Sequence, residues 1–280
     1  SKQPLTLVFP EGDDSRVVNA AVRLAKEELF KPIVLGSKEQ VQAHSREPLP
    51  QNLQVLDPET YPKEEFDKLV AAFVERRKGK NTPEQAAEML KDVNYFGTML
   101  VYLGQADGMV SGAIHSTGAT VRPALQIIKT KPNVRRTSGA FLMLRGDEKY
   151  IFSDCAINID PDAQDLAEIA LESAKTARLF DIEPRIALMS FSTKGSAKAP
   201  LVEKVIEATK IAQKLAPEEA IDGELQFDAA FVPGVAAKKA PESPVAGKAN
   251  VFVFPELQSG NIGYKIAQRL GGFEAVGPIL

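Results

Sequence analysis

Loops that combine hydroxyl groups with cations recur in this sequence, and their residue types are suited to binding anions. The longest, residues 190–198, follows an apolar run and precedes a stretch with helical spacing. Backbone N–H groups, hydroxyls and ammonium groups at the start of a helix can bind a phosphate. The candidate substrate-binding residues here are Ser192, Thr193, Lys194, Gly195 and Ser196. The glycine spacing is not that of a Walker A loop. A polar loop that caps a helix is an equal alternative to an anion-binding loop.

A second segment of this kind, residues 111–117, follows another apolar run and leads to Arg122. Ser116 and Thr117 are natural helix caps and also natural donors to a phosphate, which an arginine can hold through two parallel hydrogen bonds. A helix cap followed by a surface arginine is the alternative. His115 could act as an acid or a base, but no partner for it is visible in the sequence, so a histidine satisfied by a polar contact is favoured.

Two further segments carry several polar or charged groups. The basic cluster at residues 75–80, which contains Arg77, stands at a predicted helix end, where cations offset the helix dipole or could clamp a phosphorylated ligand. Residues 258–265, with Asn261 and Tyr264, are predicted to form a strand-to-helix loop that donates hydrogen bonds, or a simple capping motif. The four segments together indicate a phosphorylated ligand and chemistry that depends on positioning and charge stabilisation.

Metal-dependent and thiol-dependent chemistry is not expected. Asp154, Asp160 and Asp162 cluster with Asn158, but their spacing is not that of an EF-hand, and Asp162 is a candidate helix cap. The two histidines of the chain are far apart and form no ligand pair. The one cysteine, Cys155, lies in an apolar run and is interpreted as buried filler rather than as a nucleophile.

The composition argues against several classes of protein. With 280 residues and a net charge of −3, the chain lacks the basic excess of a nucleic-acid-binding protein. No stretch approaches the roughly 18 apolar residues that span a bilayer. The first residues run directly into a strand-like segment, which leaves no room for a signal peptide. A single cysteine fits a reducing compartment, so we expect a cytoplasmic protein without membrane partners.

Strand-like runs alternate with helical segments in the first half of the chain, and these elements must position the loops. The predicted strands are residues 5–9, 32–35, 53–56 and 108–113. The predicted helical regions are residues 15–29, 63–104 and 120–129, the second of them broken before Thr82, an expected N-cap with Pro83 at the first helical position. This alternation is typical of α/β proteins with a mostly parallel sheet covered on both faces.

The pattern changes after residue 136. Two β-rich runs, residues 137–144 and 149–154, flank a hairpin turn. Further strands are predicted at residues 186–191, 225–231 and 251–254, and helices at residues 162–180, 200–215 and 262–270. We expect two domains, with residues 1–136 plus 259–280 in domain 1 and residues 137–258 in an inserted domain 2.

Six strings in the chain are long enough to be specific to a family: residues 107–115, 120–126, 188–198, 221–226, 245–250 and 260–265. They resemble signatures of the phosphate acetyltransferases, or phosphotransacetylases, of the phosphate acetyl/butyryltransferase family. The resemblance runs from about residue 7 to the last residue. It implies a two-domain, three-layer αβα fold like that of isocitrate and isopropylmalate dehydrogenases, with mostly parallel sheets and the active site in the interdomain cleft.

The resemblance also implies an activity. Members of this family transfer an acetyl group reversibly between acetyl phosphate and coenzyme A (CoA) by direct attack of the CoA thiolate, without a metal or other cofactor. The family's arginines that contact the phosphorylated substrate or CoA match Arg77 and Arg122. A homodimer is implied, as is acetate kinase as a neighbour in acetate metabolism.

The chain departs from the family pattern at its end. Family members continue beyond residues 277–280 into a segment with a Ser-Arg-Gly motif and then an aspartate, the proposed base for the CoA thiol. The chain stops before these residues, so we expect a fragment that holds most of the binding site. The alternatives are a phosphate butyryltransferase, a catalytically silent binder of acyl phosphate or CoA, and a dehydrogenase of the same fold, which the lack of an acidic metal cluster disfavours.

Overall fold

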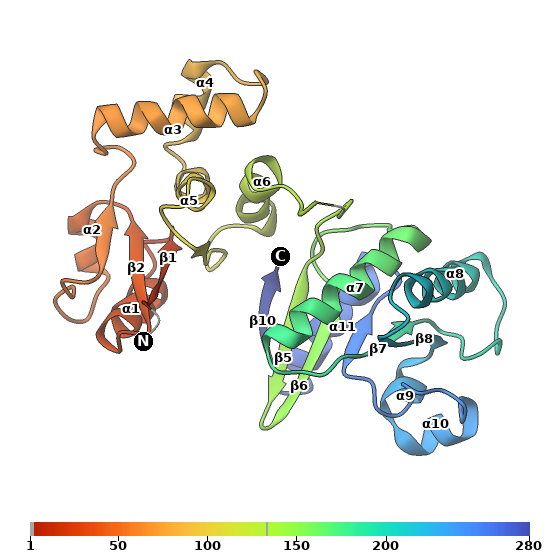
Figure 1. Cartoon of the computed structure of the whole chain (residues 1–280). Helices are drawn as coiled ribbons and strands as arrows, with labels where there is room; N and C mark the ends of the chain where they lie inside the picture. The colour runs from red at the N-terminus through yellow and green to blue at the C-terminus, as the bar shows by residue number, and fades with distance from the viewer. Residues whose placement is uncertain (1–2, 133) are drawn as a thin grey trace. The chain divides into compact units, whose positions relative to one another are not determined.

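The computed structural model describes residues 3–132 and 134–280 and divides the chain into two compact units (Figure 1). Unit 1 is Ser1–Lys129 and unit 2 is Thr130–Leu280. Each unit has its own sheet and its own buried apolar clusters, as expected of a chain of this length. No helix in the described ranges is long and apolar enough to cross a membrane.

Four parallel strands form the sheet of unit 1, in the order β3-β2-β1-β4. Their bounds are β1 (Leu5–Phe9), β2 (Phe30–Leu35), β3 (Gln54–Leu56) and β4 (Gly108–Met109). Val8 of β1 lies opposite both Ile33 of β2 and Met109 of β4, so β1 is an inner strand. The predicted parallel sheet is confirmed, and ligands of such sheets bind beyond the carboxyl ends of the strands.

Helices cover both faces of this sheet. Their bounds are α1 (Ser15–Lys26), α2 (Lys38–Ala43), α3 (Lys63–Arg76), α4 (Pro83–Met89), α5 (Val93–Tyr102) and α6 (Thr117–Ile127). Phe9 packs with residues of α1 and α2, whereas its neighbour Val8 packs with residues of α3, α4 and α5. Successive residues of β1 thus point to opposite faces of the sheet. Thr82 caps α4, as predicted, in a capping box with Gln85.

Unit 2 has a six-stranded sheet in the order β10-β5-β6-β9-β7-β8. Its strands are β5 (Ala140–Arg145), β6 (Glu148–Ser153), β7 (Arg185–Met189), β8 (Ala220–Leu225), β9 (Val251–Val253) and β10 (Glu274–Ile279). The pairs from β6 to β8 are parallel, whereas β5 pairs antiparallel with both β6 and β10. The predicted hairpin is confirmed, with Arg145 opposite Glu148.

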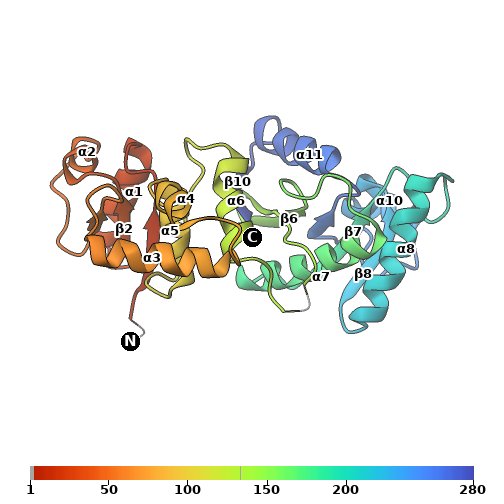
Figure 2. The same cartoon turned by 90° about the horizontal axis from the view of Figure 1, so that it is seen from above.

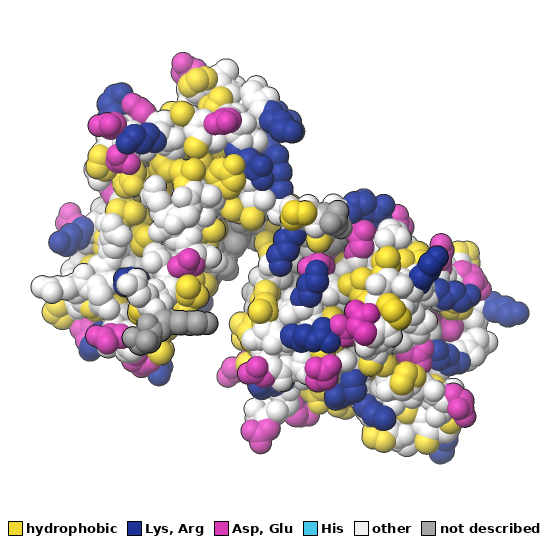
Figure 3. Space-filling model, in the orientation of Figure 1, with side chains coloured by type: hydrophobic (Ala, Val, Ile, Leu, Met, Phe, Trp, Pro, Cys, Tyr) yellow, Lys and Arg dark blue, Asp and Glu magenta, His cyan; other side chains and the backbone are white. Residues whose placement is uncertain are grey.

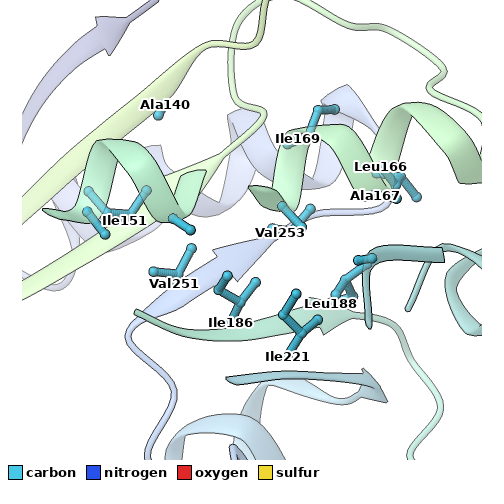
Figure 4. Packing of buried hydrophobic residues seen from close by; sticks show 14 of the residues in the cluster. Ala140, Ile151, Leu166, Ala167, Ile169, Ile186, Leu188, Ile221, Val251 and Val253 are labelled. Carbon is cyan, nitrogen blue, oxygen red and sulfur yellow. The ribbon is translucent and has the colours of Figure 1, made fainter. Parts of the chain in front are cut away.

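Two groups of helices cover the faces of this second sheet (Figure 2). Their bounds are α7 (Ala163–Leu179), α8 (Pro200–Leu215), α9 (Phe227–Phe231), α10 (Pro233–Lys239) and α11 (Leu257–Arg269). Ile151 packs beneath α7 and α8 with Ile186 and Val251 (Figure 4). The next residue, Phe152, faces the aromatic cluster beneath α9, α10 and α11.

Two predictions of local structure were wrong. Residues 225–231 are not a strand, because β8 ends at Leu225 and Phe227–Phe231 form α9. The apolar residues Phe227 and Phe231 follow helical spacing, and their rings stack at 5.6 Å. Residues 258–265 are not a loop, because α11 begins at Leu257; Glu256 caps it by accepting from two N–H groups.

The boundaries of the two units differ from the predicted domains at the C-terminal end. Residues 259–280 were expected to return to domain 1, but β10 pairs with β5, with Ala275 opposite Met143. Tyr264 of α11 stacks on Phe141 of the same strand, with ring centroids 4.0 Å apart. A strand pair joining segments about 130 residues apart leaves no local trace in the sequence, so the pattern of elements did not reveal it.

Two helical glycines allow the packing of α11 to be tested. A Cβ at Gly260 would stand 2.2 Å from the carbonyl oxygen of Asp154, whereas a Cβ at Gly234 of α10 would meet nothing within 4 Å. We expect Gly260→Ala to destabilise the protein by about 1–3 kcal/mol through overpacking. Gly234→Ala should stabilise it by up to about 1 kcal/mol through helix propensity. Urea unfolding checks both, and a Gly260→Ala variant as stable as the parent would contradict the close packing.

Candidate functional site

The carboxylate of Glu11 organises the loop that follows β4. Glu11 lies two residues after the end of β1 and is only 1% exposed. Its oxygens accept hydrogen bonds from the four consecutive N–H groups of residues 112–115, at distances between 2.7 and 3.0 Å. These N–H groups therefore do not pair with a neighbouring strand. This explains why β4 ends at Met109 rather than at the predicted residue 113.

The same carboxylate holds the ring of His115, whose Nδ1 lies 2.9 Å from Oε2 of Glu11. Burial alone would raise the pKa of Glu11, but the N–H groups of Ile114 and Ala113 and the His115 ring outweigh it and hold the pKa below its ordinary value. Glu11 is therefore ionised near neutral pH and acts only as an acceptor. Sequence reasoning missed Glu11; its position directly after an apolar strand was the available signal.

Ser116 and Thr117 lie at the start of α6, as predicted. Ser116 is the N-cap, and its hydroxyl oxygen accepts from the N–H of Ala119 at 3.2 Å. Thr117 is the first residue of the helix, and both residues are exposed. Arg122 lies further along the same helix and is also exposed. A helix start with accessible hydroxyls and a guanidinium on the same helix can bind an anion.

Arg77 and Arg122 both act on Tyr95 of α5, although they are 45 positions apart in the sequence. Burial raises the pKa of Tyr95, and the charges of Arg122 and Arg77 oppose that effect. Arg77 donates from Nε to Asn81 Oδ1 at 3.1 Å. In the described part of the chain neither arginine has a carboxylate within ion-pair distance. The two arginines predicted to contact phosphate thus both lie close enough to Tyr95 for their charges to act on its hydroxyl.

The basic cluster at the end of α3 contains one arginine with a structural role and several further cations close to one another. Arg76 donates from Nε to the carbonyl of Ile127 at 2.7 Å and from Nη2 to that of Ile128 at 3.3 Å, so it satisfies the last turn of α6. Burial and the charges of Arg76 and Lys78 lower the pKa of Lys129. Figure 3 shows Lys and Arg side chains gathered on this part of the surface. A bound polyanion would relieve their repulsion.

The loop after β7 is largely held by its own hydroxyls. Thr193 Oγ1 donates to Gln226 Oε1 at 3.0 Å and accepts from the Gln226 N–H at 2.9 Å. Ser196 Oγ accepts from the Thr193 N–H at 2.9 Å, and Ser192 Oγ accepts from the Ala197 N–H at 3.0 Å. Ser192 and Thr193 are buried. These two hydroxyls are thus used to hold the loop itself; α8 begins at Pro200 with no side-chain cap, so neither hydroxyl caps that helix.

Lys194 and Gly195 occupy the exposed turn of this loop, with φ values of 47° and 88°. The Lys194 ammonium forms an ion pair with Asp222 and donates to the carbonyl of Gly223 at 3.1 Å. Because Asp222 offsets its charge, Lys194 is a weaker anion ligand than the sequence suggested. Lys194 and Asp222 also line a surface cavity of about 440 Å³, whose other wall is Lys239 and residues 240–244.

Asn261 and Tyr264 lie on α11 and contact their own unit. Asn261 donates from Nδ2 to the carbonyl of Cys155 at 3.1 Å. Tyr264 stacks on Phe141 and is half-buried. These contacts fix α11 on the sheet, and their predicted role in substrate binding stays a prediction, as does that of residues 192–196.

Asp154 repeats in unit 2 what Glu11 does in unit 1. Its buried carboxylate accepts from the N–H groups of Gly139 and of residues 156–158, at 2.7 to 3.2 Å. Asp162 caps α7 in a capping box with Asp165, as predicted. Burial raises the pKa of the Cys155 thiol, which fits the interpretation of that cysteine as filler. Among the described residues, no three acidic, histidine or cysteine side chains gather as metal ligands.

Comparison with known proteins gives a consistent result. The phosphate acetyl/butaryl transferase family model matches residues 1–280. The chain is 63% identical to the phosphate acetyltransferase of Bacillus subtilis (strain 168) over 279 residues, which are 98% of this chain and 85% of that protein. A phosphotransacetylase structure from Streptococcus pyogenes superposes with a TM-score of 0.91 at 64% identity, covering 99% of this chain and 84% of that one.

A more distant structure agrees in fold alone. The branched-chain phosphotransacylase of Enterococcus faecalis V583 superposes with a TM-score of 0.67 at 20% identity, over 98% of this chain and 87% of that one. The family match covers residues 1–280 and therefore includes the segments that carry Arg77, His115 and Arg122. This chain therefore belongs to the phosphate acetyl/butaryl transferase family.

Proposed function

We propose that this chain is a phosphate acetyltransferase, which transfers an acetyl group reversibly between acetyl phosphate and CoA. The observation that carries the proposal is 63% identity to the phosphate acetyltransferase of Bacillus subtilis over 98% of the chain. The site in unit 1 supports it, because Arg77, Arg122 and the start of α6 offer two guanidinium groups and exposed hydroxyls to a phosphorylated substrate.

The proposed reaction needs charge stabilisation more than covalent help from the protein. The CoA thiolate attacks the carbonyl carbon of acetyl phosphate, the carbon–sulfur bond forms, and the bond to the bridging phosphate oxygen breaks. Guanidinium groups that hold the phosphate stabilise the negative charge that it gains. We propose that no metal or other cofactor takes part and that CoA and acetyl phosphate are substrates.

We also propose a setting for this activity. A single buried cysteine suits a reducing compartment, which supports a cytoplasmic location. An acetate kinase, which makes or uses acetyl phosphate, would be its neighbour in acetate metabolism.

An apolar face of unit 2 supports the expected homodimer. Ile262 and Ile266 of α11 and Leu270, its C-cap, follow one another at helical spacing and are 55%, 53% and 86% exposed. Ile266 lines a cavity of about 380 Å³ together with Phe227 and Phe231 of α9. Apolar surface of this extent is characteristic of protein contacts, and a two-fold dimer uses the same patch on both copies. We propose that this face is the dimer interface.

Thioester formation tests the activity directly. Mixing the chain with acetyl phosphate and CoA should increase the thioester absorbance, and dialysis against EDTA should leave the rate unchanged. Butyryl phosphate should react more slowly; a faster reaction would assign the chain to the butyryl branch of the family. Binding of CoA in calorimetry without turnover would instead support a silent binder and overturn the proposal.

The arginine assignment is tested by substitution. Arg77→Ala and Arg122→Ala should each cost on the order of 2–4 kcal/mol of transition-state stabilisation, or roughly 30- to 900-fold in kcat/KM. Arg23→Ala is the matched control, because Arg23 is exposed on α1 and pairs only with Glu27 among the described residues. Near-normal kcat/KM for both substrates in either site variant would refute its assignment.

The dimer is tested on α11. Ile266→Asp should convert a dimer into a monomer of 30.3 kDa in sedimentation equilibrium, because a carboxylate would have to be buried in the apolar contact. Lys265→Asp, a neighbouring exposed position, should leave the dimer intact. A parent chain that sediments as a monomer would contradict the proposed interface.

A further inference from the structure

His115 is held at two points by one carboxylate. Its Nδ1 lies 2.9 Å from Oε2 of Glu11, and its backbone N–H donates to the same oxygen at 3.0 Å. The carboxylate is itself fixed by the N–H groups of residues 112–114, so it cannot turn away. The side chain of His115 is 27% exposed, whereas that of Glu11 is 1% exposed. The imidazole is therefore a rigid group at the surface with a buried anion behind it.

This arrangement determines which ring nitrogen is available. An ionised carboxylate can only accept, so the hydrogen between the two groups belongs to Nδ1. In the neutral ring Nε2 then carries a lone pair, and in the imidazolium form it is a second N–H donor. Among the described residues no partner lies within hydrogen-bond distance of Nε2. The ring can therefore give a proton to a ligand from Nε2 without breaking its bond to Glu11.

Two other charged groups lie near this pair, both at the start of α1. Arg16 forms an ion pair with Asp14 at 2.7 Å and donates from Nη2 to the carbonyl of Ala113 at 3.1 Å. Because Arg16 and Asp14 largely offset each other, Glu11 is the charge that acts most directly on the ring.

The position of His115 in the chain connects it to the phosphate-binding groups. The residue that follows it is Ser116, the N-cap of α6, and Arg122 lies on that helix. A phosphate bound at the start of α6 would thus contact Ser116, the residue that follows His115 in the chain. Phosphate that leaves acetyl phosphate as a trianion is a poor leaving group at neutral pH, and a proton donor beside it would remove that penalty.

We propose that His115 is a catalytic acid that protonates the leaving phosphate from Nε2, and that Glu11 is the residue that positions it. This inference rests on the proposed acetyl transfer. As the thiolate sulfur bonds to the carbonyl carbon, the electron pair of the breaking carbon–oxygen bond passes to the bridging oxygen, which takes the Nε2 proton. The imidazole becomes neutral, keeps its Nδ1 proton and is reprotonated from water. In the reverse direction neutral Nε2 accepts the proton of the attacking phosphate.

His115→Asn tests the acid while preserving the loop. The asparagine Nδ2 can take the place of the histidine Nδ1 and still donate to Glu11, but nothing replaces Nε2. We expect kcat to fall by 100-fold or more with little change in the KM for CoA. The decline of activity at high pH, where the parent enzyme loses its acid, should disappear. His44→Asn is the matched control, since His44 also bonds through Nδ1, to the carbonyl of Gln40 at 2.8 Å, but on α2.

Glu11→Gln tests the positioning role. Without the carboxylate the Nδ1–H of His115 loses its ionised acceptor and the ring is held less firmly, so kcat should fall while the KM for CoA stays near that of the parent. This variant should also unfold at lower urea concentration, because a glutamine oxygen cannot accept all the N–H groups of the loop. That loss of stability alone would not lower the kcat of the folded fraction.

The outcomes separate this inference from the proposed function. A parent chain that transfers no acetyl group refutes the proposed function itself. An active parent together with a His115→Asn variant within threefold of its kcat, or with an unchanged high-pH decline, refutes the role of His115 alone. A large loss of kcat in His115→Asn with an unchanged kcat of the folded fraction in Glu11→Gln would keep the acid and refute the positioning role.

Discussion

Peptide N–H groups that turn away from a sheet must find another acceptor, and in this chain buried carboxylates provide it. Glu11 accepts from residues 112–115 in unit 1, and Asp154 accepts from Gly139 and residues 156–158 in unit 2. Each carboxylate lies within two residues of a strand end, so the rigid strand fixes the position of the loop that the carboxylate binds. Carboxylate and loop stabilise each other, because either one alone would leave buried polar groups without partners.

The candidate anion-binding segments of the two units differ in how much charge they leave for a ligand. In unit 1 the end of α3 and the middle of α6 place Arg77 and Arg122 close enough to Tyr95 for their charges to act on it, and neither pairs with a carboxylate among the described residues. In unit 2 the Lys194 ammonium is paired with Asp222, and the hydroxyls of Ser192 and Thr193 are used within the loop. The two segments thus have different capacities for an anion, and in unit 2 the partner that lowers this capacity is Asp222 on a neighbouring strand.

The two faces of the sheet in unit 2 also differ in how completely they are packed. The face beneath α7 and α8 is filled by aliphatic side chains that interdigitate. The opposite face carries an aromatic cluster, and α9 and α11 leave a cavity of about 380 Å³ between them with apolar residues at its rim. One face of the sheet is closely packed, whereas the other leaves an apolar cavity. A second copy of the chain could cover such a cavity.

The family, the alternation of strands and helices, and the individual caps could be predicted from the sequence alone, since these depend on strings of neighbouring residues. The sequence also pointed to Arg77 and Arg122 as predicted phosphate ligands, through the resemblance. Only the tertiary structure joined Glu11 to His115, 104 positions away, and β10 to β5. It also revealed that α11 contains Asn261 and Tyr264. These features depend on contacts between distant segments, and the spacing of residues along the chain carries no record of such contacts.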